Sequence, residues 1–237
     1  MASSRTDQDV GNDKVNVAIE SGKKRTFASA LDWPGWTRSG RDEAAALESL
    51  LAYGPRYQHA IRSRRLGFKA PQAVASFTIV ERLAGDATTE FGAPAAPASV
   101  ESLPVNDEEL KRLTRVLERC WIEFEAVVAA AEGKSLRKGP RGGGRTVERI
   151  VDHVVDAHYS YLRNIYWRKR RESPTGVSAV VEAVKSADAE ALAFAVSDGM
   201  PERGPRGGEL WKPRYFVRRS AWHILDHAWE IEDRVED

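Results

Sequence analysis

The chain has 237 residues, 42% of them hydrophobic and 30% charged, a composition that excludes disordered and fibrous proteins. Its 36 Lys and Arg residues balance 35 Asp and Glu residues, so the net charge of +1 argues against nucleic acid or an anionic membrane as a partner. The length exceeds the usual domain size of about 100–150 residues and allows two modest domains.

The start of the chain and its cysteine content bear on localisation. The sequence holds one cysteine, Cys120, so an intrachain disulfide framework is excluded, which suits a reducing compartment. Residues 1–13 are polar and lack the apolar core of a secretory signal, and no run of about 18 apolar residues occurs. We therefore expect a cytoplasmic protein without a membrane segment, with a disordered tail over residues 1–13.

Residues 14–84 show the pattern of a small α/β domain. Two runs that alternate apolar and polar residues, KVNVAIESG and KRTFASALDWPGWTRSG, flank a Gly-containing turn and predict a β-hairpin. Alanines and leucines at helical spacing then predict a helix over residues 42–51. The β-rich run at residues 74–80 predicts a further strand.

The turn after the second strand carries a family resemblance. It reads Asp32, Trp33, Pro34, Gly35, and a helix with an acidic start follows at Asp42. This pattern resembles the HicB-like antitoxin domain, which typically has an aspartate, an apolar residue, Pro and Gly in this turn. The resemblance covers about a fifth of the chain and implies a β-β-α unit, a motif that recurs in proteins of different function.

The remaining residues predict a linker and then an all-helical part. Residues 85–105 are rich in Gly, Pro, Ala and Thr, which is typical of a linker, and we place the domain boundary there. Asn106, with Glu109 three residues later, predicts the start of one long helix, Thr146 caps a second, and the last begins at about Pro213. With one or two shorter helices over residues 173–199, residues 106–237 predict a four-helix bundle, and the fold class is α+β.

Four of the five histidines lie on the second and last predicted helices of this bundle. His223 and His227 are one helical turn apart, so both imidazoles can reach one metal ion. His153 lies on the corresponding flank of its own helix, so three imidazoles converge if both apolar stripes face a common core. Such a pair is more often only packed or solvated. His158 is the reserve ligand, although its phase favours a buried, hydrogen-bonded histidine.

These two helices resemble those of the DinB-like family of metal-binding proteins. The resemblance rests on a Gly-rich entry before the helix of His153 and on the HxxxH pair of His223 and His227. It implies one divalent metal ion held by three histidines. Many family members continue the last helix with His, Arg and Gly, where this chain has residues 231–233, Ile, Glu and Asp. Because characterised members include thiol-dependent transferases and isomerases, the resemblance also implies a low-molecular-weight thiol.

Three neutral imidazoles leave coordination positions open, as catalytic metal sites do. Zinc, nickel and iron(II) all suit imidazole, so the ligand type does not select the ion. Asp226 and Glu230 flank the histidine pair and are candidates to orient it, although charged residues on a helix usually form a solvated face.

The string GPRGG occurs at residues 139–143 and again at 204–208, each time just before a histidine-bearing helix. Arg141, Arg145 and Arg206 are therefore candidates to bind an anionic substrate. An up-down-up-down bundle places both loops at one end, whereas the up-down-down-up order of the DinB-like family separates them.

Two functions follow from these patterns. The first, which we favour, is a metal-dependent enzyme acting on a small molecule, and it is compatible with a homodimer. The second is a HicB-like antitoxin or regulatory module with a catalytically silent bundle, in which Trp33, Trp36, Arg38 and Arg41 contact a partner. The sequence shows no helix-turn-helix, P-loop, GxSxG elbow, Rossmann glycine pattern or CxxC motif.

Overall fold

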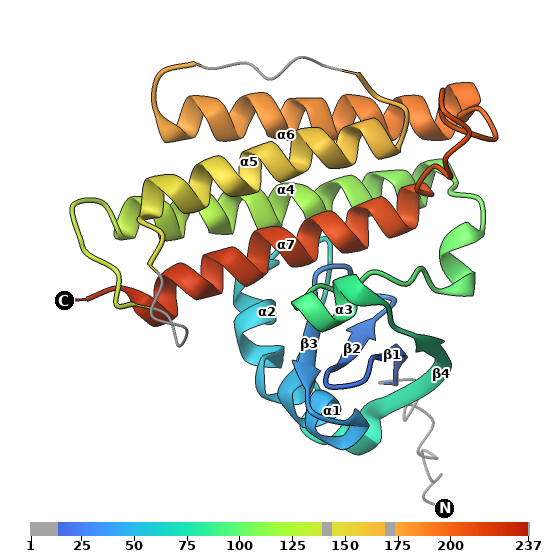
Figure 1. The fold of residues 1–237 in the computed structure, drawn as a ribbon, viewed down its shortest axis with the longest axis horizontal. Coiled ribbons are helices and arrows are strands. Elements are labelled where there is room, and N and C mark those ends of the chain that lie inside the picture. The colour runs from blue at the N-terminus through green and yellow to red at the C-terminus, as the bar shows by residue number, and fades with distance from the viewer. Residues whose placement is uncertain (1–13, 139–143, 169–173, 237) are drawn as a thin grey trace, which may run out of the picture.

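The computed structural model describes residues 14–138, 144–168 and 174–236 (Figure 1). The predicted tail over residues 1–13 lies outside these ranges. The strands are β1 (Val15–Ser21), β2 (Thr26–Ala30), β3 (Thr37–Gly40) and β4 (Phe77–Ala84). The first helices are α1 (Glu43–Ala52), α2 (Gly54–Ala60) and α3 (Ala87–Phe91), with short turns η1 (Val74–Ser76) and η2 (Ser99–Ser102). The long helices are α4 (Asp107–Ala130), α5 (Val147–Asn164), α6 (Val177–Phe194), which continues into the π-turn η3 (Ala195–Gly199), and α7 (Pro213–Arg234).

The four strands form one mixed sheet in the order β3-β2-β1-β4. The predicted hairpin is confirmed: β1 pairs antiparallel with β2, with Val17 opposite Ala30. β3 adds antiparallel to β2, and β4 returns parallel to β1 after α1 and α2. The predicted helix is also confirmed, because the Asp42 side chain accepts a hydrogen bond of 2.8 Å from the Ala45 amide and caps α1. β4 begins at Phe77, later than predicted, since η1 occupies the three residues before it.

The Asp-Trp-Pro-Gly turn is part of the core of this α/β region. Trp36, just after the turn, is fully buried, and its indole nitrogen donates a hydrogen bond of 2.8 Å to the Leu50 carbonyl. The Tyr57 hydroxyl donates another of 2.8 Å to the Pro34 carbonyl, and the Trp36 and Tyr57 rings stack at 5.7 Å. Burial of these aromatic rings with their polar atoms satisfied anchors α1 and α2 to the sheet.

Residues 85–105, predicted as a linker, contain α3 and η2 and pack against both parts of the chain. The buried Glu20 carboxylate of β1 accepts hydrogen bonds from the Ala95 and Ala96 amides. Glu101 of η2 is 4% exposed and forms an ion pair of 2.6 Å with Arg218 of α7. A division into domains at residues 85–105 stays a prediction; the stretch itself is an ordered part of the fold.

The four long helices form the predicted bundle, and the fold class, α+β, is confirmed. α4 and α5 each contact both α6 and α7. The N-terminal ends of α5 and α6 meet the C-terminal end of α4 around one cavity, lined by residues that include Val128, Val147 and Val177. At the other end, the Trp167 and Phe194 rings, which follow α5 and end α6, lie 5.4 Å apart. α5 and α6 therefore run parallel, and the helix order is up-down-down-up (Figure 1).

Helix α7 lies between the other bundle helices and the sheet (Figure 1). Every residue from Tyr215 to Leu225 is buried, because neighbours cover the helix on more than one side. The turn at Gly35 makes one of these contacts: a Cβ at Gly35 would lie 3.0 Å from the Ala221 Cβ, and its φ of +96° also favours glycine. The chain therefore needs glycine here for the sheet to approach α7.

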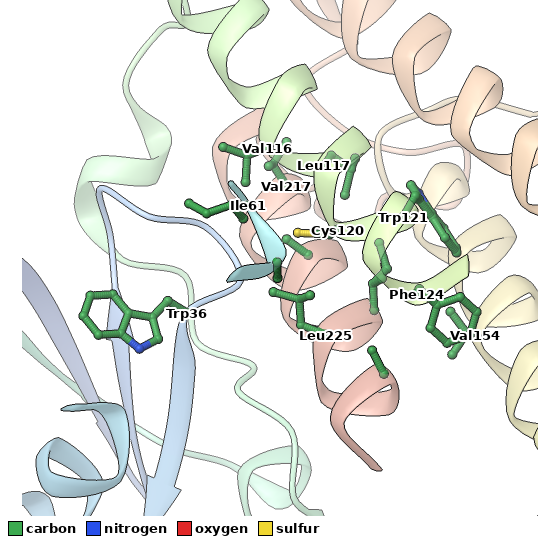
Figure 2. Close-up of a cluster of buried hydrophobic side chains, with 14 of the residues drawn as sticks. Trp36, Ile61, Val116, Leu117, Cys120, Trp121, Phe124, Val154, Val217 and Leu225 are labelled. Atoms are coloured by element: carbon green, nitrogen blue, oxygen red, sulfur yellow. The ribbon is translucent and has the colours of Figure 1, made fainter. Parts of the chain in front are cut away.

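One hydrophobic core runs through both regions. Figure 2 shows Leu117 and Cys120 of α4 near Val217 and Leu225 of α7, with Ile61 from the end of α2 beside them. Burial raises the pKa of the Cys120 thiol, so this cysteine is a packing residue rather than a nucleophile. Within the described ranges, no helix has the length and apolar character needed to cross a membrane.

Candidate metal centre

Three histidines converge in the bundle, between α5 and α7. His153 comes from the N-terminal half of α5, and His223 and His227 come from successive turns of α7. One ring nitrogen of each lies within 4.8 Å of those of the other two. The ring centres are 5.1 Å apart for His153 and His223, 4.9 Å for His153 and His227, and 4.7 Å for His223 and His227. The sequence prediction that these three side chains converge is therefore met by the geometry.

The spacing of the ring nitrogens suits a metal ion. The Nε2 atoms of His153 and His223 are 3.3 Å apart. In a tetrahedral site with metal–nitrogen distances of about 2.0–2.1 Å, two ligand nitrogens lie about 3.3–3.4 Å apart. His153 and His223 are thus already at ligand spacing, and a ring nitrogen of His227 lies within 4.8 Å of both.

Glu230 holds the third imidazole by its other nitrogen. Its carboxylate accepts a hydrogen bond of 2.8 Å from Nδ1 of His227, which leaves Nε2 of that ring for the cluster. Arg234 forms an ion pair with the same carboxylate. The pKa of Glu230 is lowered, first by its hydrogen bond to His227 and then by the nearby positive charges. An ionised carboxylate behind a histidine fixes its tautomer and orientation, as it does at many metal centres.

The environment keeps two of the imidazoles neutral. Burial lowers the pKa of His153 to about 4, with further contributions from His227 and Arg145. The pKa of His223 is lowered well below its usual value, again first by burial, then by its neighbours His227, His158 and Arg219. Because a metal ligand must offer an unprotonated nitrogen, both rings are ready to bind at neutral pH.

His158 lies next to the cluster but takes another role. It is fully buried, with Nδ1 at 3.3 Å from the Asp188 carboxylate, which also accepts a hydrogen bond of 2.8 Å from the Trp121 indole. Its ring centre is 6.2 Å from that of His223. The burial expected for His158 is observed, but neither of its ring nitrogens forms a hydrogen bond to a described residue. His223 differs from His227, since its buried Nδ1 has no hydrogen-bond partner among the described residues.

The other candidate residues are spread over the molecule. Asp226 forms an ion pair of 3.0 Å with Arg38 of β3, so of the two flanking acids only Glu230 orients a histidine. Arg145 immediately precedes the N-terminus of α5, near His153. Arg206 is at the opposite end of α5, beside a hollow that Asn164 also lines. The structure therefore does not bring Arg145 and Arg206 together, and Arg141 lies outside the described residues.

Several residues around the cluster are not indicated by the sequence pattern. The Tyr161 ring lies 5.7 Å from that of His223, and the Trp222 ring lies 6.1 Å from it. The Arg219 guanidinium lies over both of these aromatic rings. One signal was available: Arg219 precedes His223 by four residues, so the two share a face of α7.

No protein-family model matches this chain, and neither the curated proteins nor the solved structures contain a match to it. The evidence for the candidate site is therefore its geometry.

Proposed function

We propose that His153, His223 and His227 hold one divalent metal ion, and that the chain is a DinB-like metal-dependent enzyme acting on a small molecule. The observation that carries the proposal is the 3.3 Å separation of the His153 and His223 Nε2 atoms, with the third ring nitrogen within 4.8 Å. The lowered pKa of both His153 and His223 supports it, because two positively charged rings could not share this space.

The arrangement of the bundle supports the DinB-like part of the proposal. The order of its helices is the up-down-down-up order that the sequence resemblance implies. The departure from the family after His227 also has a physical account. Ile231 is fully buried, and Glu232 and Asp233 form ion pairs with Arg56 of α2. This turn of α7 holds the α/β region in place. That role accounts for the departure from the family pattern, and the three histidines are retained.

A metal ion bound by three imidazoles would keep open positions and lower the pKa of a bound water or thiol. Zinc, nickel and iron(II) remain the candidates, and a low-molecular-weight thiol is the proposed second cofactor. The protein's own part is to keep His153 and His223 neutral by burial and to fix His227 through Glu230.

The alternative, a HicB-like regulatory module, has less support. Of the residues expected to contact a partner, Trp36 is fully buried, and Arg38 lies over the Tyr53 ring while paired with Asp226. Trp33 packs at 4.8 Å from the Phe68 ring. Arg41 is exposed, but one exposed arginine paired with its neighbour Asp42 does not make a binding surface.

The metal is tested on protein purified without a histidine tag, by elemental analysis and by titration with zinc, nickel and iron(II). His227→Ala, at a partly exposed position, should weaken binding by more than about a hundredfold, since loss of a residue that merely orients a ligand already costs about 10–100-fold. His59→Ala is the control, because the His59 side chain is 67% exposed and belongs to another surface. A parent protein that takes up none of these ions, or a His227→Ala protein that binds like the parent, would show that the cluster is a packing feature.

A further inference from the structure

Arg219 is a cation buried inside the helical bundle. The residue is 8% exposed, and its Nη1 atom is buried without a hydrogen-bond partner in the described part of the chain. Among the residues that the structure describes, no Asp or Glu forms an ion pair with it. Its guanidinium carbon lies 4.6 Å from the centre of the Trp222 ring and 5.2 Å from that of Tyr161. These rings attract the charge but leave the Nη1 donors of the guanidinium unsatisfied.

The preceding residue, Arg218, is also a buried arginine, but its charge is paired. Arg218 is 3% exposed, and its guanidinium donates hydrogen bonds of 2.6 and 3.0 Å to the Glu101 carboxylate. A further hydrogen bond of 2.9 Å goes to the Ala96 carbonyl. Burial of a charge is costly unless the charge is paired, so Arg219 lacks the compensation that Arg218 has. A buried guanidinium donor without a partner is a candidate contact for an anion.

The location of Arg219 connects it with the histidine cluster. It lies one turn before His223 on α7, and the Tyr161 and Trp222 rings are each close to both its guanidinium and the His223 imidazole. Tyr161 belongs to α5, as His153 does, so the same two helices supply both the cluster and the walls around Arg219. The guanidinium and the cluster are therefore close enough together for one small molecule to contact both.

We propose that Arg219 binds an anionic group of the substrate, a carboxylate or a phosphate, while the reacting end of the substrate lies at the three histidines. The planar guanidinium is suited to either group because its parallel N–H donors match two oxygens. The inference rests on the proposed function for the role of the histidines, but the anion site itself requires only Arg219 and its surroundings. The proposal specifies that the substrate is anionic and where its charged group lies relative to the metal. Arg219 replaces the arginines of the two GPRGG loops as the leading substrate contact.

The experiment measures anion binding and metal binding separately on the full chain. Inorganic phosphate and acetate are titrated into zinc-loaded and metal-free protein at constant ionic strength, and binding is followed by calorimetry and by the rise in Tm. At least one of the two anions should bind the parent. Binding of phosphate or of acetate then indicates whether the site prefers a phosphate or a carboxylate group. Arg219→Leu should weaken this binding by about tenfold or more, as expected for the loss of a charged hydrogen-bonded pair. Zinc affinity should stay the same.

Two further variants keep the result interpretable. Arg219→Lys preserves the charge but not the paired donors, so its anion affinity should lie between those of the parent and Arg219→Leu. Arg218→Lys is the matched control, because that side chain is committed to Glu101 and its replacement should leave anion affinity unchanged. The inference is overturned if neither anion binds the parent, or if Arg219→Leu binds as tightly as the parent. Absence of zinc binding with Arg219-dependent anion binding would reject the metal and keep the anion site.

Discussion

The ion pair between Glu101 and Arg218 tests whether residues 85–105 are part of the folded unit. Both side chains are buried, at 4% and 3% exposure, and they come from η2 and α7. Burial alone would lower the pKa of Arg218, but the Glu101 carboxylate outweighs it and the pKa is raised. Glu101→Gln keeps the size of the side chain and removes its charge, so Arg218 stays buried with its charge uncompensated.

Removal of one member of a buried ion pair typically costs about 3–5 kcal/mol. Against a total stability of about 5–15 kcal/mol, this is a large fraction, and we expect a clear fall in the urea midpoint without loss of the native fold in water. Urea unfolding at pH 7 followed by tryptophan fluorescence measures it. The double variant Glu101→Leu with Arg218→Met should recover most of the loss, because neither charge then remains buried.

Glu43→Gln is the control for this experiment. It breaks the ion pair with Arg82 on the surface, where the arginine side chain is 64% exposed and water replaces the lost contact, so stability should change little. If Glu101→Gln destabilises the protein no more than Glu43→Gln, residues 85–105 do not contribute to the folded core as described.

Two predictions concern the histidine cluster. Glu230→Gln should weaken zinc binding by about 10–100-fold, measured by competition with a chelator, because His227 loses the carboxylate that orients it; an unchanged affinity would mean that Glu230 serves only Arg234. In metal-free protein, the free energy of unfolding should fall as pH drops from about 6.5 toward about 4. In that range the histidines of the unfolded chain take up protons, whereas His153 in the folded protein stays neutral because its pKa is about 4. Urea unfolding at several pH values should give a shallower slope for His153→Gln and an unchanged slope for His59→Ala; equal slopes in all three proteins would contradict the assignment.

Local signals in the sequence were enough for the helix starts and for the histidines. Asn106 and Thr146 each accept a hydrogen bond from the amide three residues later, as their capping positions predict. The convergence of His153 with His223 and His227 followed from helical spacing and the assumption of a shared core. Both inferences concern residues within a few turns of one another or on faces that an apolar stripe defines.

The features that were not predicted depend on distant contacts. The composition of residues 85–105 indicates a linker, but the Tyr215 hydroxyl, 120 residues beyond Ala95, donates a hydrogen bond to its carbonyl and helps hold the stretch in place. Arg218 and Arg219 have the composition of an exposed helix face, and they are buried because neighbours cover α7 on more than one side. Helix periodicity carries no information on direction, so the sequence does not decide that α5 and α6 run parallel.

The position of α7 links metal binding to the completion of the fold. This helix supplies His223 and His227, pairs with Arg38 and Arg56 of the α/β region and with Glu101 of η2, and follows all the other described elements along the chain. During synthesis it therefore leaves the ribosome after the sheet and the three other bundle helices. Two of the three ligands are in place only once this helix has docked. A metal ion bound at the cluster would therefore report that assembly of the described fold is complete. A peptide with the sequence of α7 alone would not reproduce the site, because it lacks His153.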